Sequence, residues 1–263
     1  MQLLYPSDPL RVRQPDEQYA DEVGAMRDAG LDVSLFSFED FQTGSFRANP
    51  QLTPNAEVLY RGWMMSGEDY RTFAEAILKR GSKPFTDHQA YLASHHLPNW
   101  YPKLKDLTPE TRIFAPDCDL AAELQNLDWP EFFIKDYVKS LKTSVGSRIS
   151  KAEQASAVVA EMKHYRGQIE GGFCVRRVEE FLPQTETRYF VLNGIAHAPT
   201  GEAPSIVSEC AKRLSSRFYS IDVVQCADGQ SRIVEVGDGQ VSDLVGWRPT
   251  VFANVLAKHF LKL

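Results

Sequence analysis

The stretch FFIKDYV at residues 132–138 decides the fold, because its aromatic and β-branched residues predict a buried β-strand. A polar loop follows at residues 139–150. Ser150 and Glu153 then have the S-x-x-E spacing of a capping box, and apolar residues recur behind them at helical spacing as far as Tyr165. The centre of the chain is therefore predicted to form a strand, a loop and a helix.

Further strands are predicted toward the C-terminus. They cover residues 173–182, 188–193, 216–226 and 231–236. Pro183 stops the first of them, and Asp228-Gly229 is a hairpin-type turn between the last two. An apolar helix is expected over residues 251–261.

Toward the N-terminus the pattern changes to β-α-β. Residues 2–5 and 31–38 are predicted strands on either side of a helix at residues 16–29. A second strand and helix follow at residues 58–63 and 67–80, which together indicate a small α/β layer. Residues 84–130 show weaker periodicity and are interpreted as a connector with short helices.

Composition excludes several functional classes. The net charge of −6 argues against general binding to nucleic acid or to anionic membranes, which needs an excess of Lys and Arg. No run approaches the ~18 apolar residues of a membrane span, and the start lacks the pattern of a signal peptide. The four cysteines are scattered singly, unlike those of zinc sites. We expect a cytoplasmic protein, and the sequence does not indicate its oligomeric state.

A first polar cluster surrounds the predicted central strand. Lys135 is a single cation in an apolar run, and the loop behind it holds Lys139, Lys142 and Ser144. Such a loop can offer backbone N–H groups and cations to phosphates. The alternative is an edge-strand lysine followed by a solvated basic turn.

A second cluster covers residues 176–188, where a strand stops at Pro183. The free backbone groups at such a stop can bind the edge of an adenine, and an acid a few residues later can hold ribose hydroxyls. Charged pairs on either side of an ordinary turn would explain the same residues.

A third cluster consists of acids on the last two predicted strands. Asp222 and Glu235 are both expected near the open end of the hairpin, and Asp238 follows. Carboxylates that meet in a partly buried site repel each other unless a cation joins them, so Mg²⁺ is the natural partner. A surface ladder of acids is the alternative.

The order of these elements over about residues 129–263 resembles the ATP-grasp superfamily. The resemblance extends to the clade named for two characteristic arginines and a lysine. Four segments carry it: YRGW at 60–63, FIK at 133–135, ETRYFV at 186–191 and EVGDGQVS at 235–242.

The resemblance implies an α+β fold in which two lobes clamp ATP. The implied boundaries are a small α/β pre-ATP-grasp domain at residues 1–90, a connector at residues 91–128, and an ATP-grasp core at residues 129–263. The core would divide into lobes at about 129–183 and 184–263.

The resemblance also implies roles for individual residues. Lys135 would contact the α-phosphate and adenine, the loop from Lys139 to Ser147 would close over the other phosphates, and Glu186 would bind ribose. Glu180 and Leu182 would hold the adenine edge through their backbones. The implied nucleotide-binding set is Lys135, Lys139, Lys142, Ser144, Glu179, Glu180, Phe181, Leu182 and Glu186.

The implied Mg²⁺ ligands are Asp222 and Glu235, but the chain departs from the family next to them. An asparagine usually stands two residues after the glutamate, and here that position is Gly237. Asp238 and Gln240 are the candidates to replace it, and we take Asp238 as the third predicted ligand.

The activity implied is that of an ATP- and Mg²⁺-dependent carboxylate–amine ligase, which forms an acyl-phosphate and releases ADP. Its substrates would be small-molecule or peptide carboxylates and amines. Arg188 would stabilise the transferred phosphate, and Arg61 would bind the acid substrate or form a structural ion pair. A small-molecule kinase and a catalytically silent nucleotide-binding module are the alternatives.

Overall fold

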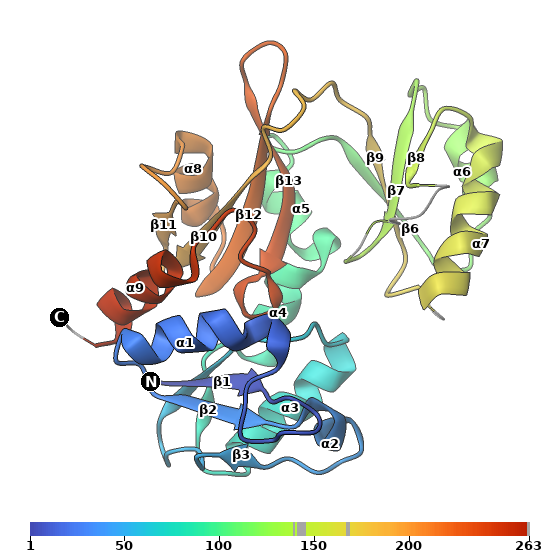
Figure 1. Cartoon of the computed structure of the whole chain (residues 1–263). Coiled ribbons are helices and arrows are strands. Elements are labelled where there is room, and N and C mark those ends of the chain that lie inside the picture. Colours follow the sequence, from blue (N-terminus) through green and yellow to red (C-terminus); the bar gives the residue numbers. More distant parts are fainter. Residues whose placement is uncertain (139, 141–145, 167–168, 262–263) are drawn as a thin grey trace. The chain divides into compact units, whose positions relative to one another are not determined.

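The computed structural model of the chain describes residues 1–138, 140, 146–166 and 169–261 (Figure 1). These residues group into two units. Unit 1 consists of Met1–Leu92, Thr187–Ile221 and Gly237–Leu263, and unit 2 of Ala93–Glu186 and Asp222–Val236.

Unit 1 begins with a five-stranded sheet in the order β3-β2-β1-β4-β5. The strands are β1 Gln2–Pro6, β2 Val33–Phe36, β3 Ala48–Asn49, β4 Glu57–Tyr60 and β5 Lys83–Pro84. All neighbours pair in parallel except β2 and β3. The predicted β-α-β opening is confirmed, with α1 at Ala20–Asp28 between β1 and β2.

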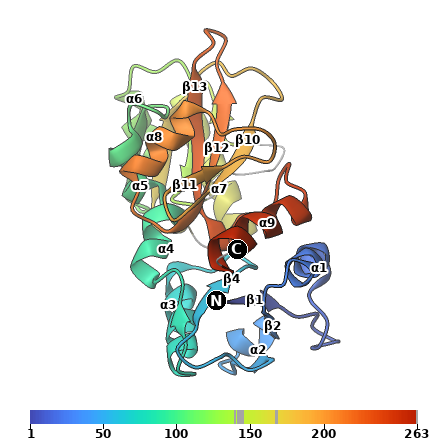
Figure 2. The same cartoon turned by 90° about the vertical axis from the view of Figure 1, so that its left-hand side faces the viewer.

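The two faces of this sheet bury different helices. Leu4 and Tyr60 pack with α2 (Phe38–Gln42) and α3 (Gly67–Leu78). Leu3 and Tyr5, which point the other way because side chains alternate along a strand, pack with α1 and with α9 (Pro249–Phe260). Figure 2 shows α1 and α3 on opposite sides of these strands.

A second sheet has the order β11-β10-β12-β13. Its strands are β10 Thr187–Leu192, β11 Ile195–His197, β12 Phe218–Gln225 and β13 Ser231–Asp238, and α8 (Ser205–Arg213) lies between β11 and β12 in the chain. A short 3-10 helix, η3 (Gly239–Val241), follows β13.

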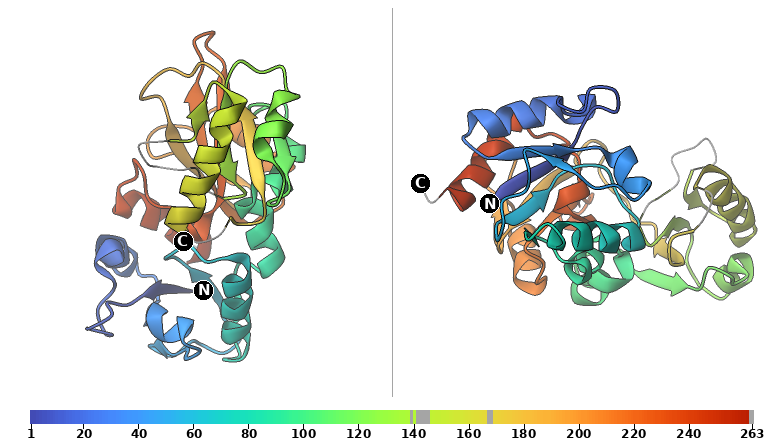
Figure 3. Two further views of the ribbon diagram at one scale, coloured as in Figure 1. Left: turned by 90° about the vertical axis from the view of Figure 1, so that its right-hand side faces the viewer. Right: turned by 90° about the horizontal axis from the view of Figure 1, so that it is seen from below.

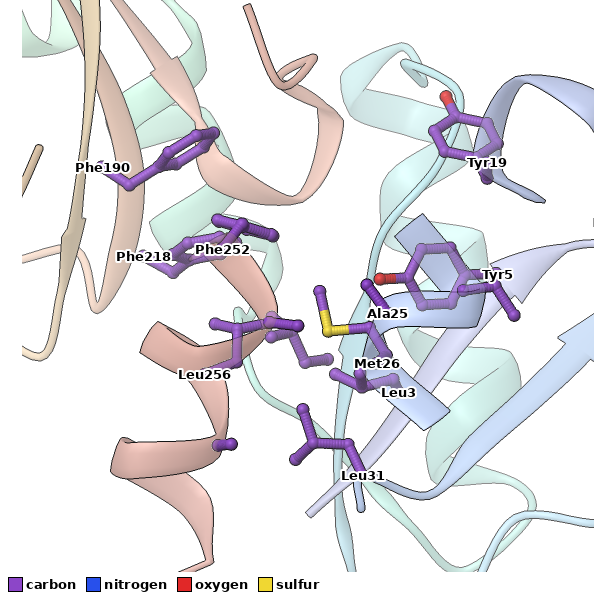
Figure 4. Close-up of a cluster of buried hydrophobic side chains, with 14 of the residues drawn as sticks. Leu3, Tyr5, Tyr19, Ala25, Met26, Leu31, Phe190, Phe218, Phe252 and Leu256 are labelled. Atoms are coloured by element: carbon purple, nitrogen blue, oxygen red, sulfur yellow. The ribbon is translucent and has the colours of Figure 1, made fainter. Parts of the chain in front are cut away.

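One hydrophobic cluster explains why distant segments belong to unit 1. Phe190 of β10, Phe218 of β12 and Phe252 of α9 share it with Leu3 of β1 and Met26 of α1 (Figure 4). The structure therefore groups the N-terminal residues with parts of the predicted ATP-grasp core at residues 129–263. The sequence had suggested domains that follow one another along the chain. Only long-range packing defines such a grouping.

Unit 2 is built on an antiparallel sheet in the order β6-β9-β7-β8. Its strands are β6 Thr111–Phe114, β7 Phe132–Asp136, β8 Arg148–Ile149 and β9 Phe173–Arg177. Strand β6 lies inside the predicted connector at residues 91–128, so that boundary needs correction. Its four residues are too few to give a clear alternating pattern. Helix α5 (Leu97–Leu104) also lies in this stretch, and α4 (His88–His95) overlaps its start.

Helices α6 (Leu120–Gln125) and α7 (Ala155–Arg166) cover one face of this sheet. Ile134 and Val175 pack against Leu124 and Met162 in a separate core, and Figure 3 shows α7 lying over the strands. The predicted capping box of Ser150 and Glu153 is replaced by another cap. A 3-10 turn, η2 (Ala152–Gln154), precedes α7, and the Gln154 side chain accepts hydrogen bonds from the N–H groups of Ser150 and Lys151.

The opposite face of the unit 2 sheet carries two cationic side chains, those of Lys135 and Arg176. Lys135 is paired with Cys174 and Phe133 with Arg176, and paired residues point to the same side of a sheet. All four therefore point away from the core under α6 and α7. This surface is called the open face below.

Candidate functional site

Lys135 and Glu235 form the charged pair of the open face. The Lys135 Nζ donates a hydrogen bond to Glu235 Oε1 at 3.0 Å. The lysine side chain is only 6% exposed, whereas that of the glutamate is 41% exposed. A buried ammonium needs such a partner, and a half-exposed carboxylate is accessible to a ligand. The two residues are 100 positions apart, so only the fold brings them together.

Arg176 is the second buried cation of the open face. Its Nη1 donates to the carbonyl of Val234, and its Nη2 donates to the hydroxyl of Thr108 and, at 3.4 Å, to the carbonyl of Ile233. Its Nε has no hydrogen-bond partner among the residues that the structure describes. Burial lowers the pKa of Arg176 to about 10, so the guanidinium stays protonated at neutral pH.

The segment after β9 was predicted to bind the adenine and the ribose. Glu179 forms an ion pair with Arg232 at 2.9 Å. Phe181 pairs with Cys226, and the N–H of Leu182 donates to the carbonyl of Gln225 at 2.8 Å. The Leu182 N–H is thus already bonded to Gln225, so it is not free to hold an adenine edge in this structure. Phe181 and Leu182 keep exposed side chains, as do Glu180 and Glu186.

A pocket of about 400 Å³ lies in unit 2 beside this segment. It is lined by Tyr101, Lys105, Asp106, Thr108, Glu110, Glu179 and Arg232. Its charges are of both signs, and it includes Glu179 from the predicted nucleotide-binding set.

Three residues of the predicted phosphate loop, Lys139, Lys142 and Ser144, lie outside the described residues. The end of that loop is described. Ser147 is buried and its carbonyl accepts a hydrogen bond from the N–H of Ile134 at 2.8 Å, which returns the chain to β7. Gly146 has φ +69°, a left-handed conformation that glycine adopts without strain.

The three predicted metal ligands do not form a cluster. Within the described part of the chain, no group of three or more His, Cys, Asp or Glu side chains could hold a metal ion. Asp238 is fully buried, and its Oδ1 accepts hydrogen bonds from the N–H and the Nε2 of Gln240, which cap η3. Asp238 and Gln240 therefore have structural roles that the sequence did not reveal.

Residues 124–256, just over half of the chain, match the model of an ATP-grasp domain family, the third family of the clade named for two arginines and a lysine. The chain belongs to this family. The expected α+β ATP-grasp fold and clade are thereby confirmed.

Solved structures agree with this ATP-grasp assignment at the level of the fold. D-cycloserine synthetase DcsG superposes with a TM-score of 0.69 at 14% identity, covering 98% of this chain and 99% of that one. A RimK domain ATP-grasp protein from Sphaerobacter thermophilus gives 0.64 at 15% identity over 99% and 100%. D-alanyl-alanine synthetase A from Vibrio cholerae gives 0.62 at 10% over 100% and 99%. No curated protein matches the sequence.

The two predicted catalytic arginines of this ATP-grasp chain have different surroundings in unit 1. Arg61 is 1% exposed and donates to both carboxylate oxygens of Glu22, at 2.7 and 2.8 Å. Its Nη1 also donates to the carbonyls of Gly239 and Ser242. Although burial lowers it, the pKa of Arg61 is raised overall by Glu22. These contacts favour the structural ion pair over the predicted role in binding the acid substrate.

Arg188, at the start of β10, is only partly buried. Its Nη1 donates to the carbonyl of Asp243 at 3.1 Å, and its own carbonyl accepts the Nε1–H of Trp247 at 2.8 Å. Its partial exposure keeps Arg188 a candidate for contact with a substrate.

Sequence reasoning gave no role to Thr108 or Arg232, and it gave none to Arg176 beyond its place in the second polar cluster at residues 176–188. Arg176 did offer a signal, because it alternates with the apolar residues Phe173 and Val175 and would therefore point away from the core that they face. Thr108 and Arg232 offered none, since their importance depends on contacts with distant segments.

Described residues form no helix that is long and apolar enough to cross a membrane.

Proposed function

We propose that this protein is an ATP- and Mg²⁺-dependent carboxylate–amine ligase that forms an acyl-phosphate and releases ADP. The observation that carries the proposal is the Lys135–Glu235 pair on the open face, within an ATP-grasp domain. A buried cation beside a half-exposed carboxylate suits a site that receives a nucleotide phosphate together with its metal ion.

Two carboxylates, that of Asp222 on β12 and that of Glu235 on β13, fit Mg²⁺ as its ligands. A Cβ built on Gly237 would lie 3.3 Å from Ser220 Oγ, so these positions share one side of the two neighbouring strands. Since side chains alternate, Asp222, two residues after Ser220, and Glu235, two before Gly237, are expected on that same side. Carboxylate oxygens are the preferred ligands of Mg²⁺. We propose these two residues as its ligands and leave Asp238 out.

The bound Mg²⁺ would neutralise charge on the phosphates of ATP. The chain's own residues would do the remaining work. Lys135 supplies a fixed positive charge on β7, and Glu180, Phe181 and Glu186 supply groups for the base and the ribose. Arg188 is the proposed cation for the transferred phosphoryl group. Positioning and charge neutralisation are the main contributions of a protein to phosphoryl transfer.

The similar structures support the proposed substrate classes. Two are named as synthetases, of D-cycloserine and D-alanyl-alanine, and the macrocyclase MdnC is bound to its precursor peptide MdnA. We infer small-molecule or peptide carboxylates and amines for this chain. The net charge of −6 supports a partner other than nucleic acid, and the use of ATP supports a cytoplasmic location.

The test is an incubation with ATP, Mg²⁺ and a panel of amino acids and short peptides, with ADP, AMP and products measured separately. A ligase gives ADP and an amide that needs both substrates. AMP as the sole nucleotide product would overturn the proposal, and a stable phosphorylated product formed without an amine would indicate a kinase.

One observation favours a silent nucleotide-binding module as the second candidate. Gly237 replaces the asparagine that usually completes the metal site, and a Cβ there would lie 3.1 Å from Ser242 Oγ. The Ser220 and Ser242 hydroxyls, 2.8 Å apart, thus occupy the space for a larger side chain. Tight ATP binding without turnover on any substrate pair would identify such a module.

A further inference from the structure

The backbone just before Glu235 is held by a set of hydrogen bonds inside unit 2. Arg176 donates to the carbonyls of Val234 and Ile233, and the Thr108 hydroxyl donates to the carbonyl of Ile233 at 2.6 Å while accepting from Arg176. The N–H of Ile233 donates to the carbonyl of Leu107 at 2.9 Å. Segment 107–108 and strand β9 together fix the two residues that precede Glu235.

Arg176 is unusual because its charge has no direct carboxylate partner among the described residues. Its side-chain bonds all go to carbonyl and hydroxyl oxygens, and none of the described carboxylates lies within ion-pair distance. A buried cation in this position is costly unless a nearby negative charge offsets it. Burial lowers the pKa of Arg176, and the nearby charge of Glu235 acts against that lowering.

We infer that Arg176 and Thr108 are positioning residues that hold Glu235 in place for the nucleotide-bound Mg²⁺. The inference rests on the proposed function. It makes the Mg²⁺ affinity of the site depend in part on two residues that are not proposed as ligands of the ion or the nucleotide. Arg176 acts through the carbonyls of Ile233 and Val234 and through its charge. Thr108 orients the guanidinium and holds the same carbonyl.

Such support has a measurable consequence. A carboxylate that is held in place before a metal ion binds loses less conformational freedom on binding, and outer partners of metal ligands commonly contribute about 10- to 100-fold in affinity. Loss of the Thr108 hydroxyl should therefore lower the affinity for Mg²⁺. Its effect on the stability of the folded protein should be smaller.

The first experiment compares Thr108→Val with Thr111→Val. Thr111 is a matched control, because it is also buried in unit 2 and its hydroxyl also donates to a carbonyl, that of Pro109 at 3.0 Å. Melting temperatures are measured with ATP while Mg²⁺ is titrated. Thr108→Val should raise the Mg²⁺ concentration for half-maximal stabilisation about 10-fold. Thr111→Val should leave it at the wild-type value, and an equal shift in both variants would overturn the inference.

The second experiment needs no ligand and uses hydrogen exchange over residues 231–238. Arg176→Met and Thr108→Val should both speed exchange in this segment of the free protein, relative to Thr111→Val, because local opening becomes easier. Unchanged exchange would overturn the positioning role even where ATP and Mg²⁺ stabilise the wild type. A different result would refute the proposed function: a wild-type protein whose melting temperature does not rise with ATP and Mg²⁺. The link to metal affinity would then fall as well, whatever the exchange rates show.

Discussion

Arg61 in unit 1 and Lys135 in unit 2 are both buried cations paired with a glutamate, yet their surroundings differ. The partner of Arg61 is Glu22, whose side chain is 6% exposed, while the partner of Lys135 is 41% exposed. Arg61 also lies near the rings of Phe190 and Phe252, the latter at 4.9 Å. An ion pair that is buried on both sides stabilises the unit that surrounds it. In a pair with one accessible carboxylate, a ligand can reach the carboxylate and the cation beside it.

The largest effect is expected at the closed pair. Arg61→Met should lower the free energy of unfolding by about 3–5 kcal/mol, because it leaves the Glu22 carboxylate buried without a counter-charge. Urea titration measures this loss. The double variant Arg61→Met with Glu22→Met should recover part of it, since both charges are then gone. A loss below about 1 kcal/mol would erase the proposed difference between the two pairs.

At the accessible pair, Lys135→Ala should cost function rather than stability. Glu235 can be hydrated when its partner is removed, so unfolding should become easier by less than it does in Arg61→Met. The rise in melting temperature with ATP and Mg²⁺ should disappear, because a ligand stabilises only the state that it binds. Lys163→Ala, on the exposed surface of α7, is the control and should keep the full rise. Retained stabilisation in Lys135→Ala would contradict the assignment.

A pair of histidines in unit 1 extends the comparison to pH. The Nε2 atoms of His197 and His259 lie 3.0 Å apart. Burial, with smaller contributions from His259 and Lys258, lowers the pKa of His197 from 6.5 to about 4. The unfolded chain therefore binds the proton more readily, and stability that is present above pH 6.5 should be lost as the pH falls toward 4.

The measurement is the urea midpoint of the wild type and of His197→Gln between about pH 7 and pH 5, a range that brackets the ordinary pKa of histidine. The wild type should lose more stability over this range than the variant does. The exposed residue His164 provides the control, and His164→Gln should follow the wild type. Equal pH dependence in all three proteins would remove His197 as the cause.

The smallest effect is expected at a pair exposed on both sides. Arg71 and Glu68, 3.2 Å apart on α3, have side chains that are 55% and 82% exposed. Arg71→Ala should change the free energy of unfolding by about 0.5 kcal/mol or less, because water screens such pairs. A calorimetric melt tests this, and a change as large as that of Arg61→Met would show that burial does not rank these pairs.

The sequence by itself determined the family, most of the elements and the position of Lys135. The apolar run around Lys135, the β-α-β opening and the hairpin turn at Asp228-Gly229 are local signals, because strand, helix and turn preferences depend on neighbours in the chain. The pairing of distant acids was also suggested by strand order, though the sequence could not tell which of them face a ligand.

Only the tertiary structure decided which charged residues are available to contact a ligand. Arg61 and Asp238 resemble site residues in the sequence, but the fold buries them and bonds them to Glu22 and Gln240. Arg176 belonged to a charged cluster in the sequence, and the fold uses it to hold the strand just before Glu235. The physical reason is that burial and hydrogen-bond partners come from segments far apart in the chain, and one residue's neighbours in sequence do not specify them.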